Sequence, residues 1–472
     1  MNAADVPTDL LHAFEVQRTS FDAASFPDWE LRRDRLARLR RLVEDNEVAI
    51  EDAIHADFGG RPRTETQIAE VFPSLAEIKV ALRKGRKWMQ PRSAGVSIWF
   101  LPARAHIQPR PLGVVGIVVP WNYPLFMAIG PLVAALVAGN RALVKMSEYT
   151  PAFSALFEQL VAKTFAPEEV AVVNGGPDVA AQFTRLPFNH LFFTGSTLIG
   201  RKVMGAAAEN LTPVTLELGG KSPTVIAPGY PLERAAQRIL AGKLLNAGQT
   251  CIAPDYVFVH RDALAGFVEA TRHQAKRMYP AGLDDPDFCS IINQRQYGRL
   301  LGYVDEARDR GVEVVSLFEG RMQDDERHRL GPAVVVNPGQ GLAMMREEIF
   351  GPLLPLLPYD DVKEAIDFVN AQPSPLAMYW FDEDRERTEW ALKESHAGGM
   401  CVNETLMHIA QEELPFGGVG PSGMGHYHGE WGFETFSKLT PVFKQSRFNG
   451  MSLFMPPYRP HVQTILRLMK RF

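Results

Sequence analysis

The sequence predicts an α/β protein with three parts: a doubly wound parallel sheet, a second α/β domain, and a small β-arm. Short β-branched runs alternate with helix-length segments from residue 112 to residue 194, and a second alternation begins after Ser222. Near-continuous apolar strands separated by helices are typical of parallel strands that are covered on both faces. An extended segment at 93–111, which has no obvious core of its own, predicts the arm.

The chain is expected to open with amphipathic helices over residues 29–56. Apolar residues recur there at helical spacing, with arginines and acids between them: Leu36, Leu39, Val43, Ile50 and Ile54. We expect the arginine cluster at 32–41 to form the solvated face of these helices.

The strands of the first sheet are expected at 113–119, 142–145, 170–173 and 190–194, with helices after Pro124, Pro151 and Pro177. The apolar run at 125–139 is shorter than the roughly 18 residues that span a bilayer, so it predicts a buried helix. In the second domain, strands are expected at 225–226, 256–259, 333–336 and 353–356, and helices near 231–247 and 262–277. The end of the chain, 458–472, mixes apolar and basic residues. It predicts a helix docked on its own protein or on a partner subunit, or one lying on a membrane surface.

Composition narrows the class of protein. With 472 residues, 46% of them hydrophobic, the chain is long enough for two or three domains. Its 50 basic and 55 acidic residues give a net charge of −5, which lacks the positive bias expected of a nucleic-acid-binding protein. The three cysteines, at 251, 289 and 401, form neither a disulfide framework nor a metal-ligand pattern. A reducing compartment, the cytoplasm, is therefore expected, and the first twenty residues lack a signal-peptide pattern.

One cysteine and one acid stand in suggestive surroundings. Cys251 follows Gly248 and Thr250, small neighbours that are expected to leave room for a substrate. A thiolate is the reactive form of cysteine, and a thiol with a pKa of about 8.5 needs help from a dipole or a base. Glu217 ends an apolar, strand-like run and is followed by two glycines, which suggests a base. A purely structural cysteine is the alternative.

Two turns follow predicted strands of the first sheet. Asn122 stands between the strand at 113–119 and the next helix, where α/β proteins bind ligands. Its amide either donates to a developing oxyanion or caps the helix. Gly195 and Ser196 open another helix, which either receives a pyrophosphate at its N-terminus or is a plain tight turn.

Further polar candidates follow other strands and loops. Lys145 and Glu148 come after a strand, where an acid commonly binds a ribose; surface charge is the alternative. Glu348, an acid two residues before the aromatic Phe350, is a further candidate. The glycine-rich loop at 415–423 follows no clean strand and predicts a wall or lid rather than a phosphate site. The histidines at 426 and 428 lack further ligands, so no metal site is expected.

Six motifs, in this order and spacing, resemble the aldehyde dehydrogenase superfamily, and the resemblance covers nearly the whole chain. They are Pro120-Trp121-Asn122-Tyr123-Pro124, Phe193-Thr194-Gly195-Ser196, Glu217-Leu218-Gly219-Gly220-Lys221, Gly248-Gln249-Thr250-Cys251, Glu347-Glu348-Ile349-Phe350-Gly351-Pro352 and Pro415-Phe416-Gly417-Gly418. Within the superfamily the chain resembles the class 3 branch, and most of all its bacterial coniferyl aldehyde dehydrogenases.

The resemblance implies roles for the residues singled out above. Cys251 would attack the aldehyde, Asn122 and the Cys251 backbone N–H would hold the oxyanion, and Glu217 would activate water to hydrolyse the thioester. The cofactor would be NAD, with NADP possible. The implied cofactor contacts are Pro120, Trp121, Lys145, Glu148, Gly195, Ser196, Glu348 and Phe350. The expected walls of the substrate pocket, apolar and partly aromatic, are Tyr123, Met127, Thr250, Ile252, His408 and Phe416.

The resemblance also implies an assignment of the chain to domains. Residues 1–92 and 112–219 would bind NAD(P), 220–415 would form the catalytic domain, 93–111 with 436–450 would form an arm that joins two subunits, and 451–472 would be a tail. The expected partners are a small aldehyde and a second copy of the chain, with no transmembrane segment. A phenylpropenal such as coniferyl aldehyde is the expected substrate, and a medium- or long-chain aliphatic aldehyde is the alternative. Transfer of the acyl group to coenzyme A and a non-enzymatic derivative of the fold are the other hypotheses.

Overall fold

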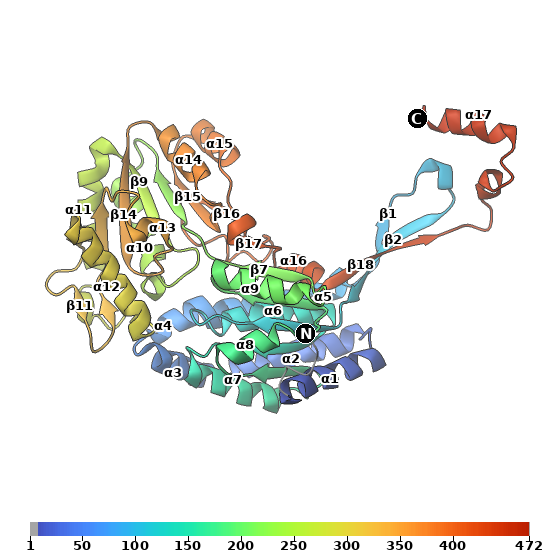
Figure 1. Ribbon diagram of the computed structural model, residues 1–472, viewed down its shortest axis with the longest axis horizontal. Coiled ribbons are helices and arrows are strands. Elements are labelled where there is room, and N and C mark those ends of the chain that lie inside the picture. The colour runs from blue at the N-terminus through green and yellow to red at the C-terminus, as the bar shows by residue number, and fades with distance from the viewer. Residues whose placement is uncertain (1–7, 472) are drawn as a thin grey trace.

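The computed structural model describes residues 8–471 and consists of two sheet-centred lobes and a projecting arm (Figure 1). The first lobe contains the N-terminal helices and the first sheet. The second lobe contains the second sheet, and the arm carries the end of the chain away from both. One continuous cluster of buried apolar side chains runs through the cores of the two lobes. The predicted α/β class, with two sheets and an arm, is confirmed.

The first sheet has six strands in the order β17-β7-β6-β3-β4-β5. Its strands are β3 (Val114–Val118), β4 (Arg141–Lys145), β5 (Val170–Val173), β6 (His190–Thr194), β7 (Val214–Glu217) and β17 (Gly423–Met424). All are parallel except β17, which pairs antiparallel with β7. Val118 lies opposite both Lys145 and Phe193, and Thr194 lies opposite Glu217. The carboxyl ends of four strands therefore meet at one edge, where ligands bind in such sheets.

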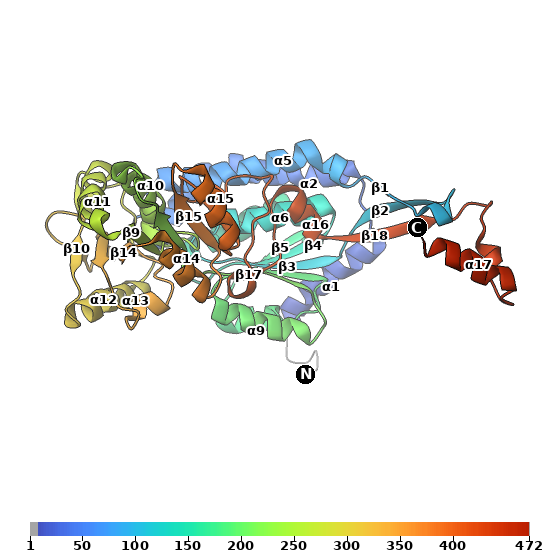
Figure 2. The same ribbon diagram turned by 90° about the horizontal axis from the view of Figure 1, so that it is seen from above.

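Helices cover both faces of this sheet, as the near-continuous apolar strands predict. The connecting helices are α6 (Phe126–Ala138), α7 (Pro151–Thr164), α8 (Pro177–Phe183) and α9 (Thr197–Ala208). Figure 2 shows α6 with α2 and α5 on one side of the sheet and α9 with α1 on the other. Every residue of α6 is buried, as expected for the apolar run at 125–139.

From Thr8 on, where the described part of the chain begins, five helices come before the arm, and the predicted apolar stripe at Leu36, Leu39, Val43, Ile50 and Ile54 is buried. The helices are α1 (Thr8–Ala23), α2 (Trp29–Glu44), α3 (Glu47–Phe58), α4 (Arg63–Thr66) and α5 (Phe72–Trp88). A short π-helical turn (Gln67–Val71) joins α4 to α5.

The prediction of a solvated arginine face on α2 is wrong for two of its arginines. Arg32 is 1% exposed and donates hydrogen bonds to the carbonyl oxygens of Val137 and Ala138, at the end of α6. Those carbonyls have no partner within their own helix, and a cation is favourable at that end of the helix dipole. Arg35 is also buried and forms an ion pair with Glu169. These arginines therefore fasten α2 to the sheet layer.

The second sheet has seven strands in the order β10-β13-β14-β9-β8-β15-β16, all parallel except β10. The strands are β8 (Pro223–Ile226), β9 (Tyr256–His260), β10 (Val314–Ser316), β13 (Ala333–Val336), β14 (Leu353–Tyr359), β15 (Ala377–Phe381) and β16 (Gly399–Val402). The helices of this lobe are α10 (Leu232–Leu244), α11 (Leu264–Met278), α12 (Gln294–Asp309), α13 (Ala343–Arg346), α14 (Val362–Ala371) and α15 (Arg385–Glu394). A separate two-stranded ribbon joins β11 (Gln323–Asp324) to β12 (Arg329–Leu330).

The arm is a three-stranded antiparallel sheet formed by β1 (Arg92–Ala94), β2 (Arg104–Pro111) and β18 (Ser437–Lys444). The expected partner of the segment at 93–111 is thus a distant part of the same chain, because β2 pairs with β18 along eight residues. Helix α16 (Gly429–Thr435) leads into β18, and α17 (Pro460–Met469) lies near the far end of the arm, away from both lobes (Figure 1). Within residues 8–471, no helix is long and apolar enough to cross a membrane.

Candidate active site

Cys251 lies on the connection between α10 and β9, as predicted, and follows a strained turn. Asn246, Ala247 and Gly248 all have positive φ angles, of 55°, 50° and 79°. Non-glycine residues rarely adopt this conformation, and where they do, it is often at a functional site. A Cβ at Gly248 would lie 2.3 Å from the Gly351 carbonyl oxygen. The expectation that Gly248 leaves room for substrate is therefore wrong, since the space at this glycine is filled by backbone.

Hydrogen bonds fix the segment on both sides of the turn. The Gln249 side-chain amide donates to the carbonyl oxygens of Asn246 (2.9 Å) and Ser290 (3.1 Å), and its oxygen accepts from the backbone N–H of Ile292. The Thr250 hydroxyl lies 2.6 Å from the Tyr123 hydroxyl, so Thr250 is also a partner in this network. The partly exposed thiol is thus presented by a rigid segment.

Asn122 reaches from the first sheet edge to this segment. Its side-chain Nδ2 donates to the Gln249 carbonyl oxygen at 3.1 Å. Helix α6 begins only at Phe126, so Asn122 does not cap that helix. An amide nitrogen carries two N–H groups, and one of them remains available to an oxygen bound at the thiol.

A buried ion pair, which the sequence did not predict, lies against the turn that contains Asn122. Arg61 donates to Glu70 at 2.7 Å, and neither side chain is exposed. Arg61 also donates to the Asn122 carbonyl oxygen at 3.1 Å, while Glu70 accepts the N–H groups of Leu125 and Phe126 at the start of α6. A carboxylate is favourable at a helix N-terminus. The pair therefore fixes both the Asn122 turn and the helix that follows it.

Glu217 ends β7 and is 3% exposed. Neither of its carboxyl oxygens has a hydrogen-bond partner among the described residues. Because burial disfavours the charged form, the pKa of Glu217 lies well above its ordinary value. An unpaired buried carboxyl group with a raised pKa is typical of a general base poised for proton transfer.

The Cys251 thiol lies within electrostatic reach of two acids. Burial, together with the nearby Glu348 and Glu217 carboxylates, raises the pKa of Cys251 to about 12. The backbone N–H groups of Cys251 and Ile252 act in the opposite direction. At neutral pH the sulfur is therefore protonated, and it must lose a proton to become a nucleophile.

The predicted cofactor residues of the first lobe gather along the edge where the parallel strands end. Lys145, at the end of β4, is buried rather than on the surface, and its Nζ donates to the Met146 and Gly175 carbonyl oxygens at 2.7 Å each. Glu148 is exposed three residues later. Gly195 and Ser196 precede α9, and Ser196 caps that helix. A helix N-terminus along the same edge of the sheet as a lysine and an acid fits a dinucleotide.

Glu348 and Phe350 come to this edge from the second lobe. A Cβ at Gly219 would lie 2.2 Å from Glu348 Oε2, so this carboxyl group lies against the end of β7. Its Oε1 is buried without a hydrogen-bond partner in the described part of the chain, and burial raises the pKa of Glu348 to about 8. The Phe350 ring is 5.3 Å from the ring of Trp121, the residue after Pro120. An unpaired acceptor and two aromatic rings fit the second nucleotide of such a dinucleotide.

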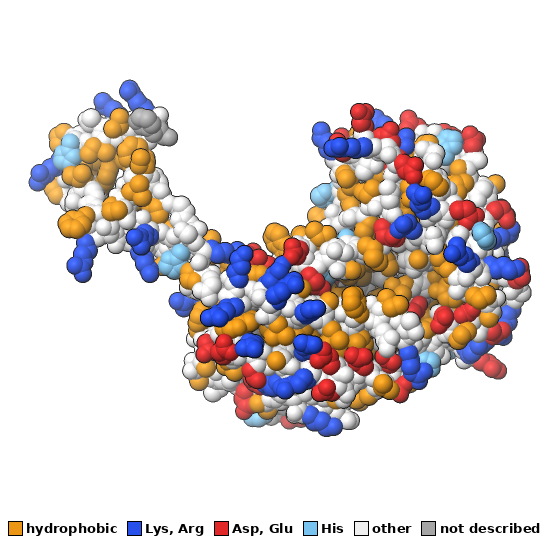
Figure 3. All heavy atoms as spheres, turned by 180° about the vertical axis from the view of Figure 1, so that it is seen from behind, with side chains coloured by type: hydrophobic (Ala, Val, Ile, Leu, Met, Phe, Trp, Pro, Cys, Tyr) orange, Lys and Arg blue, Asp and Glu red, His pale blue; other side chains and the backbone are white. Residues whose placement is uncertain are grey.

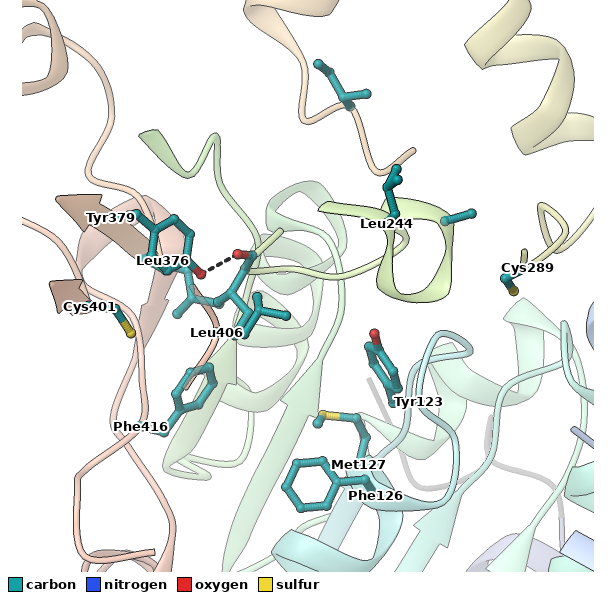
Figure 4. Packing of buried hydrophobic residues seen from close by; sticks show 14 of the residues in the cluster. Tyr123, Phe126, Met127, Leu244, Cys289, Leu376, Tyr379, Cys401, Leu406 and Phe416 are labelled. Atoms are coloured by element: carbon teal, nitrogen blue, oxygen red, sulfur yellow. Dashed lines mark hydrogen bonds between the residues drawn. The ribbon is translucent and has the colours of Figure 1, made fainter. Parts of the chain in front are cut away.

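The six predicted pocket residues form two groups, and Figure 4 labels three of them, Tyr123, Met127 and Phe416. Tyr123, Met127 and Thr250 belong to one group. Ile252, His408 and Phe416 belong to the other, and the His408 and Phe416 ring centres are 5.7 Å apart. Figure 4 shows Tyr123 and Met127 across from Phe416.

Two tyrosines that sequence reasoning missed extend these groups. Tyr379, on β15, donates from its hydroxyl to the Ile252 carbonyl oxygen. The Tyr427 hydroxyl lies 3.9 Å from the Met127 sulfur. Tyr427 lies between the histidines at 426 and 428, for which the sequence predicts no metal site. Among the described residues, no group of His, Cys, Asp or Glu is arranged to hold a metal ion.

Comparisons with known proteins agree with this architecture. A family model described as the aldehyde dehydrogenase family matches residues 3–442. A probable coniferyl aldehyde dehydrogenase of Pseudomonas aeruginosa is 48% identical over 453 residues, which cover 96% of this chain and 94% of the relative. A coniferyl aldehyde dehydrogenase of a Pseudomonas species is 43% identical over 93% of this chain and 92% of its own. A solved structure of Staphylococcus aureus AldH in a substrate-bound state, 34% identical, matches with a TM-score of 0.93 over 99% of this chain and all of its own.

Proposed function

The chain belongs to the aldehyde dehydrogenase family, and from this premise we propose that it oxidises a phenylpropenal such as coniferyl aldehyde to the carboxylic acid with NAD(P). The observation that carries the proposal is the meeting of Cys251, Asn122 and Glu217 at one point between the two sheets. Asn122 contacts the segment that ends in the thiol, and Glu217 acts on the sulfur electrostatically. A nucleophile, an oxyanion donor and a base are the groups that acyl chemistry on a thiol needs.

In the first step, the Cys251 sulfur bonds to the aldehyde carbon as the thiol loses its proton. Glu217, once ionised, is the nearby unpaired acceptor for that proton. The developing oxyanion accepts hydrogen bonds from the free N–H of Asn122 and from the Cys251 backbone. When bound, an oxidised nicotinamide would supply the acceptor for the hydride of the same carbon, and the resulting thioester would be held on Cys251.

In the second step, Glu217, which has released the thiol proton to solvent, takes a proton from water as the water oxygen attacks the thioester. The C–S bond breaks, the acid leaves, and Glu217 returns its proton to the sulfur, which restores the thiol for the next turnover. A carboxylate placed to activate water favours hydrolysis over transfer to coenzyme A. Retention of all three groups also argues against a non-enzymatic derivative.

We assign the cofactor to the edge of the first sheet. Lys145 and Glu148 would hold the adenosine ribose, Gly195 and Ser196 the pyrophosphate, and Glu348 the nicotinamide ribose. Phe350, Trp121 and Pro120 would pack around the ring system. Glu148 accepts a hydrogen bond from a free 2′-hydroxyl and repels a 2′-phosphate, so NAD is the preferred cofactor and NADP the weaker one.

The substrate assignment rests on the aromatic surroundings of the thiol and on the relatives. Tyr123 contacts Thr250, the residue before Cys251, and Figure 4 shows Phe416 across from Tyr123. Two relatives that are more than 40% identical are described as acting on coniferyl aldehyde. A flat conjugated aldehyde suits a site between such rings.

The domain assignment follows from this chemistry. Residues 1–92 and 112–219 form the cofactor domain, 220–415 the catalytic domain, 93–111 with 436–450 the arm, and 451–472 a tail. We propose that the arm joins two copies of the chain, because it exposes large apolar side chains that include Ile98, Leu101 and Phe443. The three free cysteines fit a cytoplasmic location.

Purified full-length protein, mixed with NAD and coniferyl aldehyde with and without coenzyme A, tests the proposal. NADH and ferulic acid are expected at a rate that does not depend on coenzyme A. Formation of an acyl-coenzyme A would show that the acyl group is transferred to coenzyme A and not hydrolysed. A much higher kcat/KM for hexanal or decanal than for coniferyl aldehyde would show that the preferred substrate is an aliphatic aldehyde. No NADH with any aldehyde would reject the enzymatic function.

A further inference from the structure

A cluster of polar side chains lies beyond the catalytic residues, between α5, α6 and the segment that precedes α16. It comprises Glu77 on α5, Glu412, and His428, and is called here the distal polar cluster. A Cβ at Gly130 of α6 would lie 3.0 Å from Glu77 Oε2 and 3.2 Å from the Tyr427 ring. The Glu77 carboxyl group and the Tyr427 ring therefore both lie against the turn of α6 at Gly130, which has no side chain.

The distal polar cluster has buried atoms without hydrogen-bond partners among the described residues. Glu77 is 2% exposed and His428 is fully buried. Glu77 Oε2, Glu412 Oε2 and both ring nitrogens of His428 have no partner. Buried polar groups are nearly always paired, because an unpaired one loses the hydrogen bonds that water gave it. Several such atoms in one place point to a ligand that pairs with them.

Aromatic residues connect this cluster with the reacting thiol. The Tyr427 hydroxyl lies 3.9 Å from the sulfur of Met127, a predicted wall of the pocket. The Phe416 ring, on the other side, stacks on the His428 ring with 5.5 Å between ring centres. Tyr427 is acted on by the charges of Glu217 and Cys251 and also by those of Glu77 and Glu412. Tyr427 thus stands between the catalytic residues and the distal polar cluster.

The charge of the cluster suits a neutral ligand. Burial and the neighbouring Glu412 raise the pKa of Glu77 well above its ordinary value, and burial raises the pKa of Glu412 to about 7. Burial lowers the pKa of His428 to about 3, so its ring is neutral. The cluster therefore offers carboxyl and imidazole groups that both donate and accept hydrogen bonds. A carboxylate-bearing ligand would be repelled, and no metal-binding group includes these residues.

We propose that Glu77, Glu412 and His428 bind the phenolic hydroxyl of a para-hydroxylated phenylpropenal whose aldehyde carbon lies at Cys251. The hydroxyl donates to a carboxyl oxygen and accepts from the imidazole or from a protonated carboxyl group. The aromatic ring of the substrate lies between Tyr123 and Phe416, because the Tyr427 and Phe416 rings themselves meet edge to face with 6.0 Å between their centres. This inference rests on the proposed aldehyde oxidation and adds the group that selects among aldehydes, since a site built to pair with a hydroxyl rejects analogues that lack it.

Three substrates of one shape test the proposal: 4-hydroxycinnamaldehyde, 4-methoxycinnamaldehyde, which lacks the donor, and cinnamaldehyde. The measured quantity is kcat/KM for each, with full-length protein and saturating NAD. The wild type should prefer the hydroxylated substrate over cinnamaldehyde by about tenfold or more, the effect of losing one hydrogen bond to a charged or buried partner. Glu77→Leu should abolish that preference through the KM of the hydroxylated substrate, and Glu77→Gln should retain part of it.

Matched controls separate recognition from a structural role. Glu413, the exposed neighbour of Glu412 that pairs with Lys84, gives the control Glu413→Gln, which should keep the full preference. Replacing an unpaired buried carboxyl group by leucine should leave the unfolding temperature of Glu77→Leu unchanged or raised. A lowered unfolding temperature with the wild-type preference would mark Glu77 as structural and overturn the proposal.

Other outcomes also overturn it. An equal loss of kcat/KM for all three aldehydes in Glu77→Leu would indicate a proton path from the catalytic residues. A preference for a cationic aminoaldehyde would indicate that the carboxyl groups bind an ammonium group. A wild type that oxidises all three aldehydes equally would end the inference but keep the aldehyde dehydrogenase assignment. No NADH with any aldehyde would instead reject the proposed function itself.

Discussion

The side-chain amide of Asn122 donates a hydrogen bond of 3.1 Å to the carbonyl oxygen of Gln249, two residues before the thiol of Cys251. The first of these residues follows β3 of the first sheet, and the second precedes β9 of the second sheet. This contact joins the two lobes at the place where the reaction is proposed to occur. The proposed oxyanion donor and the proposed nucleophile are therefore fixed relative to each other before substrate binds.

Asn122→Ala should lower kcat/KM by about 100-fold or more, the usual effect of removing one oxyanion donor. The KM for the aldehyde should change far less than kcat, because the hydrogen bond strengthens as negative charge develops. Asn370→Ala is the control, since Asn370 makes a comparable amide hydrogen bond, to Glu394, remote from the site. A change in KM alone would contradict the assignment of Asn122.

Glu217→Gln should separate the two half-reactions. The thiol still reacts, so one equivalent of NADH should appear in a burst, although more slowly if Glu217 also takes the thiol proton. The steady-state rate that follows should fall by about 100-fold or more, because no group activates water. Stopped-flow absorbance of NADH measures both phases. A steady state at the wild-type rate would show that another group is the base.

The pH dependence of turnover should report the raised pKa of Glu217. The base acts in its ionised form, so kcat should rise as the pH increases and Glu217 loses its proton. The midpoint of this rise should lie well above the pKa of an ordinary carboxyl group, and kcat should fall at lower pH, where Glu217 is protonated. In Glu217→Gln this rise should disappear. Steady-state rates of both proteins from pH 5 to pH 9 provide the comparison, and an identical pH profile in the variant would assign the titration to another residue.

Gly248→Ala should damage both folding and activity. Its φ of 79° and the 2.3 Å approach of a Cβ to the Gly351 carbonyl oxygen leave no place for a methyl group. The expected loss in the free energy of unfolding is about 2 kcal/mol or more. Gly205→Ala is the matched control, because that glycine lies in α9 with nothing within 4 Å of a Cβ and should gain stability. Equal unfolding midpoints for the two variants would contradict the strained turn.

The full chain should be a dimer at micromolar concentration, as measured by light scattering after size exclusion. Phe443 is 53% exposed on the arm, and Phe443→Glu should shift the mass toward the monomer. Leu211→Glu is the control, since Leu211 is 90% exposed but lies on the turn after α9, away from the arm. A wild type that runs as a monomer would refute the role of the arm.

The sequence predicted the sheets well because parallel strands are buried on both faces and so have an unmistakable apolar pattern. It could not predict which arginines of α2 are buried. Arg32 is paired with carbonyl groups 105 and 106 residues away, and only the folded chain brings them together. The apolar spacing of α2 was correct, but the partners of its polar residues depend on tertiary structure.

The candidate site was predictable where a motif follows a strand. Asn122 and Glu217 were placed at strand ends, and the structure brings both to Cys251. Gly248 was misread, because a sequence shows that a residue is small but not that its φ is positive. Arg61, Glu70 and the distal polar cluster were missed, since a buried polar side chain has no signature in sequence periodicity.

The most direct test of the central claim is mass spectrometry of Glu217→Gln mixed with NAD and coniferyl aldehyde and then quenched in acid. The intact protein should gain the mass of one feruloyl group, and peptide analysis should place that group on Cys251. The peptides that contain Cys289 and Cys401 should be unmodified. An unmodified protein that has nevertheless produced NADH, or an acyl group on another residue, would contradict a thioester on Cys251 that Glu217 hydrolyses.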